Sequence, residues 1–119
     1  MGAPVVHFEI IGKDAAKLQK FYGEVFDWEI NADNPLSYGL VASQRDKNSI
    51  GGGIAADDKG GPGHVTFYVE VDDPQVTLDK IETLGGKTVV PVTTIPGMVT
   101  FALFADPEGH VVGLVKSEV

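Results

Sequence analysis

The sequence contains no cysteine. This absence excludes disulfides, thiolate metal sites and cysteine nucleophiles. Basic side chains are few, since nine Lys and Arg stand against seventeen Asp and Glu and give a formal charge of −8. Such a surface repels phosphate backbones and anionic lipids, so we expect no nucleic-acid or membrane partner. No apolar run approaches about 20 residues, and "MGAPVVHFEI" has no basic region before an apolar stretch. We therefore expect a cytoplasmic protein.

Motifs of several common chemistries are also missing. No serine elbow and no clustered Ser, His and Asp triad is present. The run "GGGI" at residues 51–54 has no strand–GxGxxG–helix context and no following lysine, so it is not a phosphate-cradling loop. We interpret it as a strand where another group packs close to the backbone.

The 119 residues that are present have the composition of one globular domain, with 43% hydrophobic and 22% charged residues. Two halves show the same order of expected elements, a strand, a helix and three strands. Asp14 and Asp73 are expected N-caps of helices over about 14–26 and 74–84. The flexible "DDKGGPG" separates the halves, so we expect module one over about 1–58 and module two over about 59–119.

Each module is expected to begin with a strand that has one apolar and one polar face. Residues 5–10, "VVHFEI", place Val6, Phe8 and Ile10 opposite His7 and Glu9. Residues 64–71 place apolar Val65, Phe67, Val69 and Val71 opposite His64, Thr66, Tyr68 and Glu70. We expect the helices to bury the apolar faces and the polar faces to line a concave site.

These two βαβββ modules, with "KFYGEVFDWEI", "YVEVDDP" and "FADPEGHVVGLV", resemble the vicinal oxygen chelate superfamily. That superfamily includes lactoylglutathione lyase, bleomycin-resistance proteins and extradiol dioxygenases. The resemblance spans essentially the whole chain. It implies an α+β fold in which the modules form a curled, cup-shaped mixed sheet with helices on the outer face. It also implies a small-molecule ligand in the cup and a homodimer.

In that superfamily a divalent metal, where present, is usually held by one residue from the first and one from the last strand of each module. The matching positions here are His7, Thr66, Gly113 and, within one residue, Gly53. Glycine offers no ligand and threonine is a weak one, so we expect no metal. A site through His7 and His64, with Glu9 as a third ligand, is disfavoured but stays open. The glycines would leave room for a bulkier organic ligand.

Six residues are candidates for the site. His7 and Glu9 are candidate catalytic residues, because imidazole titrates near neutrality and a neighbouring carboxylate can orient it and raise its pKa. Candidate substrate-binding residues are Tyr38, His64, Thr66 and Tyr68. Structural roles are the alternative for all six, such as a hydrogen-bonded pair, an exposed strand end or ordinary core.

Three functions remain open. One is a metal-independent small-molecule-binding protein like the resistance proteins. Another is a lyase or isomerase that is metal-assisted through His7 and His64 or uses His7 and Glu9 as acid and base. The last is a dimeric interaction module without a ligand. The missing carboxylates favour the binding protein, whereas the His7–Glu9 pair keeps an enzyme open.

Overall fold

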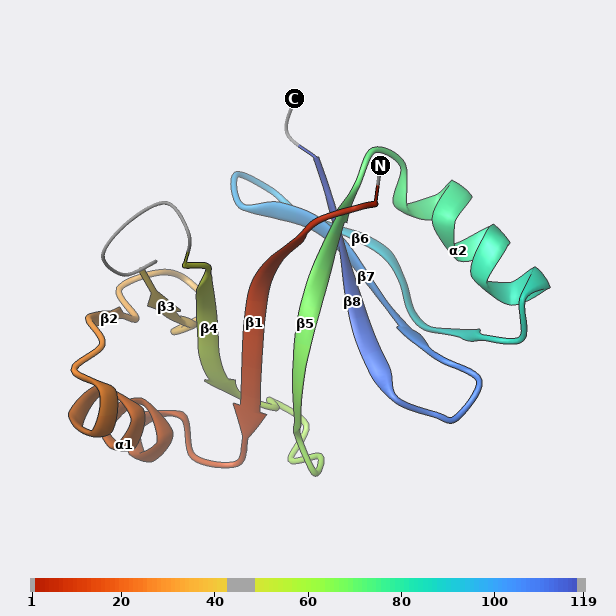
Figure 1. Cartoon of the computed structure of the whole chain (residues 1–119). Coiled ribbons are helices and arrows are strands. Elements are labelled where there is room, and N and C mark those ends of the chain that lie inside the picture. Colours follow the sequence, from red (N-terminus) through yellow and green to blue (C-terminus); the bar gives the residue numbers. More distant parts are fainter. Residues whose placement is uncertain (1, 43–48, 118–119) are drawn as a thin grey trace. The chain divides into compact units, whose positions relative to one another are not determined.

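The computed structural model describes residues 2–42 and 49–117, so the turn expected over 44–48 lies outside the described residues. Its elements follow the expected order twice, with one strand, one helix and three strands in each half (Figure 1). Two compact units result, which we call the first unit (residues 7–65) and the second unit (residues 66–119 with residues 1–6).

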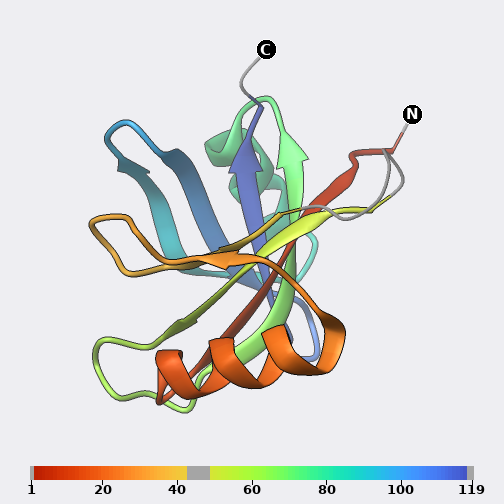
Figure 2. The ribbon, with the colours of Figure 1, turned by 90° about the vertical axis from the view of Figure 1, so that its left-hand side faces the viewer.

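The first unit is a four-stranded mixed sheet with one helix. Its elements are β1 (Val5–Gly12), α1 (Ala15–Phe26), β2 (Ile30–Asn31), β3 (Gly39–Val41) and β4 (Gly51–Ala56). The strand order is β2-β3-β4-β1, and only the β4–β1 pair is parallel. Helix α1 begins after Asp14, whose side chain accepts from the Lys17 amide, and runs along the strands (Figure 2). Between helix and sheet lies a core of Ile10, Val41 and Ile54, surrounded by Phe8, Leu18, Tyr22, Trp28 and Ile30.

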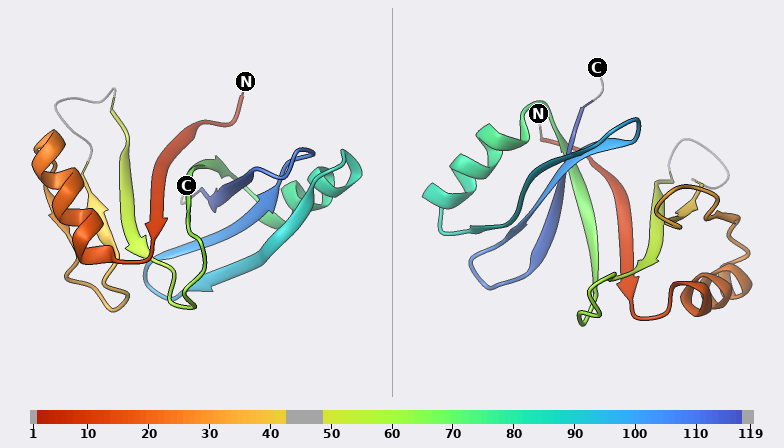
Figure 3. Two further views of the ribbon diagram at one scale, coloured as in Figure 1. Left: turned by 90° about the horizontal axis from the view of Figure 1, so that it is seen from below. Right: turned by 180° about the vertical axis from the view of Figure 1, so that it is seen from behind.

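The second unit repeats this arrangement. Its elements are β5 (His64–Val71, beginning in the first unit), α2 (Pro74–Thr83), β6 (Lys87–Ile95), β7 (Val99–Ala105) and β8 (Val111–Lys116). The order is β5-β8-β7-β6, with β5 and β8 parallel and the long β6–β7 hairpin visible in Figure 3. Asp73 caps α2 by accepting from two amides, and Leu78 packs with Ala102 and Leu114 beneath the helix. Residues 1–6 belong to this unit, where the Glu70 amide donates a hydrogen bond to the Pro4 carbonyl.

The α+β fold with two βαβββ modules is confirmed, but the expected burial along β5 is wrong at two positions. Val69 and Val71 pack against the α2 core, whereas Val65 is 77% and Phe67 is 42% exposed. Because α2 follows directly after β5, it contacts the end of that strand and leaves its beginning uncovered. Within the described residues, neither helix is long and apolar enough to cross a membrane.

Candidate functional site

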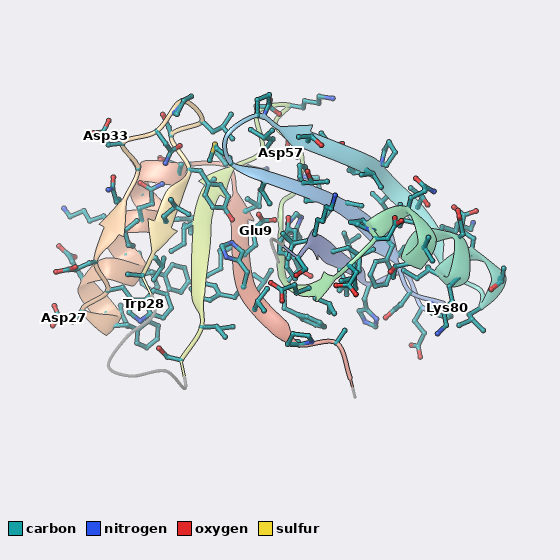
Figure 4. All side chains as sticks on the ribbon, turned by 90° about the horizontal axis from the view of Figure 1, so that it is seen from above. Glu9, Asp27, Trp28, Asp33, Asp57 and Lys80 are labelled. Carbon is teal, nitrogen blue, oxygen red and sulfur yellow. The ribbon has the colours of Figure 1, made fainter. Side chains whose placement is uncertain are left out.

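Four of the six candidate residues form one hydrogen-bonded network inside the first unit. Glu9 lies on β1 (Figure 4), and its Oε2 accepts from the Tyr38 hydroxyl at 2.8 Å. The other oxygen, Oε1, is 2.8 Å from Nε2 of His64, at the start of β5. His7 Nε2 lies 2.9 Å from the Tyr38 hydroxyl. We call these four residues, His7, Tyr38, Glu9 and His64, the polar network.

This geometry changes the expected relation between His7 and Glu9. They share a face of β1 as predicted, but the Tyr38 hydroxyl bridges them. A phenol has one proton, and Tyr38 donates it to Glu9, so toward His7 its oxygen can only accept. His7 therefore carries a proton on Nε2, and in the neutral ring the basic nitrogen is Nδ1. The two hydrogen bonds therefore point the same way: His7 donates to the Tyr38 hydroxyl, and Tyr38 donates to the Glu9 carboxylate.

Burial controls the charge of His7. Removal from water lowers the pKa of His7 below its ordinary value, and the nearby Glu9 carboxylate opposes this shift only in part. The Glu9 carboxylate does act to raise this pKa, as expected, but burial has the larger effect. His7 is therefore neutral near pH 7.

Two neighbours place Tyr38 in the network. The Asn34 side chain closes the preceding loop, since its Oδ1 accepts from the Tyr38 amide at 3.0 Å and its Nδ2 donates to the Tyr38 carbonyl at 2.7 Å. Gly53 lies opposite Glu9 on the paired strand β4. A Cβ at Gly53 would overlap the Tyr38 ring and hydroxyl, so only glycine allows this position of the ring.

These two supporting roles were not assigned from the sequence. For Asn34, the signal that could have identified it is an Asn-Pro pair whose proline lies three residues before an aromatic residue. The interpretation of "GGGI" as a place of close packing is confirmed, because Tyr38 covers Gly53 and Phe8 covers Gly52. The idea that the glycines leave room for a ligand is wrong at Gly53, where that space is filled.

The remaining candidates, Thr66 and Tyr68, belong to the second unit. The buried Thr66 hydroxyl donates to the Val111 carbonyl on β8 at 2.6 Å, which ties the two parallel strands together. Tyr68 is also buried, and it pairs in register with Gly113. Its ring covers that glycine as Tyr38 covers Gly53, so the space over Gly113 is filled too.

Two open hollows elsewhere do not include the polar network. One, of about 410 Å³, lies beside α1 near Gln19, Lys20 and Trp28. The other, of about 530 Å³, lies at one end of β6–β8 near Thr94 and Lys116. The network, in contrast, combines the buried Glu9 carboxylate with a histidine whose pKa is lowered by burial. Chemistry therefore favours the network as the candidate site.

Two βαβββ modules, each with a parallel pairing of its first and last strands, define an α+β protein of the glyoxalase type. Residues 5–114 match the model of the Glyoxalase/Bleomycin resistance protein/Dioxygenase superfamily. The chain belongs to this superfamily.

Individual relatives are distant. A "Glyoxylase-like domain-containing protein" of Didymella fabae is 29% identical over 113 residues, which cover 86% of this chain and 84% of the relative. The "Anthracycline biosynthesis protein DnrV" of Streptomyces peucetius is 26% identical over 91% of this chain, which spans only 44% of that protein. Methylmalonyl-CoA epimerase of Streptomyces coelicolor, solved with 2-nitronate-propionyl-CoA, superimposes with a TM-score of 0.66. That match covers 98% of this chain and 99% of the epimerase at 14% identity, so it bears on the fold alone.

The residues present do not fit the divalent metal that the superfamily implies. Gly53 and Gly113 supply no ligand atom, and rings lie over both. The Thr66 hydroxyl is held by a backbone carbonyl. Within residues 2–42 and 49–117, no three His, Cys, Asp or Glu side chains are grouped so that they could hold a metal ion.

Proposed function

We propose that this chain binds a small organic molecule at the polar network without a divalent metal. The buried Glu9 carboxylate carries the proposal. Glu9 is 7% exposed, and both of its oxygens are engaged by side chains that stay partly accessible, Tyr38 and His64. Burying a carboxylate costs free energy that a structural role alone does not require, so such groups concentrate at functional sites.

Charge indicates which polar group this site accepts. The network contains one carboxylate, and His7 is neutral near pH 7 because burial lowers its pKa. The whole chain has a formal charge of −8. We therefore expect the part of the ligand at His7 and Tyr38 to be neutral or cationic, for example a carbonyl, hydroxyl or amine, rather than a carboxylate.

The relatives support a small organic ligand. Methylmalonyl-CoA epimerase, which shares the fold, has been solved with CoA esters bound. Family membership allows the same class of ligand here, with the acyl end at the network. This transfer is a proposal, because that relative is 14% identical.

A thermal-shift screen tests the binding proposal. The library should contain CoA thioesters and matched sets of small amides, amines and carboxylates. A ligand at 100 times its dissociation constant stabilises the fold by about 2.7 kcal/mol. Binding of a hit should weaken in His7→Ala and Glu9→Gln but not in the controls His110→Ala and Glu108→Gln. These controls change exposed residues of the turn after β7. A hit that binds equally well to all four variants would contradict the proposal.

Proton transfer to or from the bound molecule is the second candidate function. It is favoured by the chain of donors from His7 Nε2 through the Tyr38 hydroxyl to Glu9. When Nδ1 takes a proton from a ligand, the imidazolium that forms is stabilised through Tyr38 by the carboxylate. A carboxylate stabilises the imidazolium in serine-protease triads in a related way. His7 would be the catalytic base, and Glu9 and Tyr38 would be positioning residues.

Solvent deuterium reports on this reaction. A hit with a C–H next to a carbonyl is incubated with the chain in D2O, and loss of that proton is followed by NMR. We expect exchange to stop in His7→Ala and to slow in Tyr38→Phe. Exchange that continues unchanged in His7→Ala would contradict the role of His7 as the base and would leave binding as the function.

A further inference from the structure

In the first unit the positions that match the superfamily's metal ligands are His7 on β1 and Gly53 on β4, so the ion would have to lie beside the His7 imidazole and over Gly53. In this chain that place contains an oxygen atom, the Tyr38 hydroxyl, 2.9 Å from His7 Nε2 and 2.8 Å from Glu9 Oε2. A divalent ion on the same nitrogen would lie about 2.0–2.1 Å from it. Ion and hydroxyl cannot both occupy the space.

We propose that the Tyr38 hydroxyl is a protein-supplied substitute for the metal ion. It binds the His7 imidazole in the place of a cation, and it links this imidazole to Glu9 by one accepted and one donated hydrogen bond. A neutral hydroxyl, unlike a divalent ion, brings no positive charge to this place. This inference deepens the proposed function and rests on it only in taking the polar network as the ligand site.

Gly53 is the residue that makes the substitution possible. The last-strand position of a metal-binding module has a ligand side chain, but at Gly53 even a Cβ would overlap the Tyr38 ring. A ligand side chain at this position and the Tyr38 ring in its present place therefore exclude each other. Asn34 then fixes the loop so that the hydroxyl stays between His7 and Glu9.

Metal binding by the unmodified chain is the first test. Chain purified without an affinity metal and treated with chelator is titrated with Co²⁺, whose visible d–d absorption reports coordination, and with Zn²⁺ by equilibrium dialysis. We expect no saturable binding that depends on His7. One Co²⁺ bound per chain, and lost in His7→Ala, would overturn the inference whether or not any ligand binds at the network.

A gain of binding is the second test. The double variant Tyr38→Ala/Gly53→Glu removes the ring and adds a carboxylate, so it should bind Co²⁺ at least about tenfold more tightly than the unmodified chain. Binding should be lost again when His7→Ala is added. The matched control is Tyr38→Ala/Gly53→Gln, which removes the same ring but adds a neutral amide in place of the carboxylate.

Each outcome of the second test decides something. The inference fails if the folded double variant binds no more Co²⁺ than the unmodified chain, or if the control gains as much. Circular dichroism reports whether each variant is folded. If the double variant does not fold, Tyr38→Ala/Gly53→Asp replaces it, since it adds a shorter carboxylate at the same position. The proposed function fails in a different way, namely if the binding of an organic ligand is unaffected by His7→Ala.

Discussion

Replacing Gly53 by alanine is the sharpest test of how the polar network is built. Alanine in place of an ordinary strand glycine stabilises a protein by about 0.5–1 kcal/mol. At Gly53 the added Cβ would overlap the Tyr38 ring, so the ring must move. Overpacking costs about 1–3 kcal/mol, and lost hydrogen bonds from Tyr38 to a buried carboxylate cost about 1–3 kcal/mol. We expect a net destabilisation of about 2–4 kcal/mol, measured by urea unfolding at constant m-value.

A double-mutant cycle isolates the cause. With Tyr38→Ala the ring is absent, so Gly53→Ala should then be neutral or stabilising by up to about 1 kcal/mol. The coupling free energy between the two positions should be about 2–5 kcal/mol, which begins within and extends above the range for residues in contact. Gly23→Ala in α1 is the control, because its Cβ would lie 3.4 Å from the nearest atom and should stabilise the helix. An equal cost of Gly53→Ala in both backgrounds would refute the proposed contact.

Four further predictions concern the rest of the chain. Because burial lowers the pKa of His7, the unfolded chain binds more protons than the folded chain at pH values below 6.5 and above the folded pKa, so stability falls as the pH falls through that window. Urea unfolding at several pH values measures how steeply stability depends on pH, and this slope should become smaller in His7→Gln. An unchanged slope in that variant would contradict the role of His7. Leu78→Ala should cost about 2–5 kcal/mol, since Leu78 is 1% exposed; a loss below 1 kcal/mol would mean that α2 packs differently. Asp73→Ala should cost about 1 kcal/mol by removing the α2 cap, as thermal unfolding can check. We also propose a homodimer that buries more than about 1,000 Å², to which the exposed Val65 and Phe67 could contribute; a monomeric mass in light scattering would contradict it.

Local sequence signals were sufficient for most of the fold. The strand expected over residues 64–71 agrees with β5, because alternation and turn residues mark both of its ends. Both helices begin after the expected Asp caps because their side chains accept backbone amide protons there. The exposure of Phe67 was not predictable from alternation. The pattern indicates which face is apolar, but how far α2 reaches along β5 depends on where the chain turns into the helix.

The candidate site was likewise predictable from the sequence only in part. Placing His7 and Glu9 on one face of β1 needs only the two-residue period of a strand. The bridge through Tyr38 depends on a loop conformation set by Asn34 and on the opposition of Glu9 to Gly53 across two paired strands. The opposition of Glu9 to Gly53 is not local in sequence. The glycine still held a usable signal, because interiors are close-packed and a strand without a side chain leaves a volume that another group must fill. Where a metal ligand is expected and glycine stands instead, the side chain that covers the glycine is therefore the first candidate to have taken over the role of the ion.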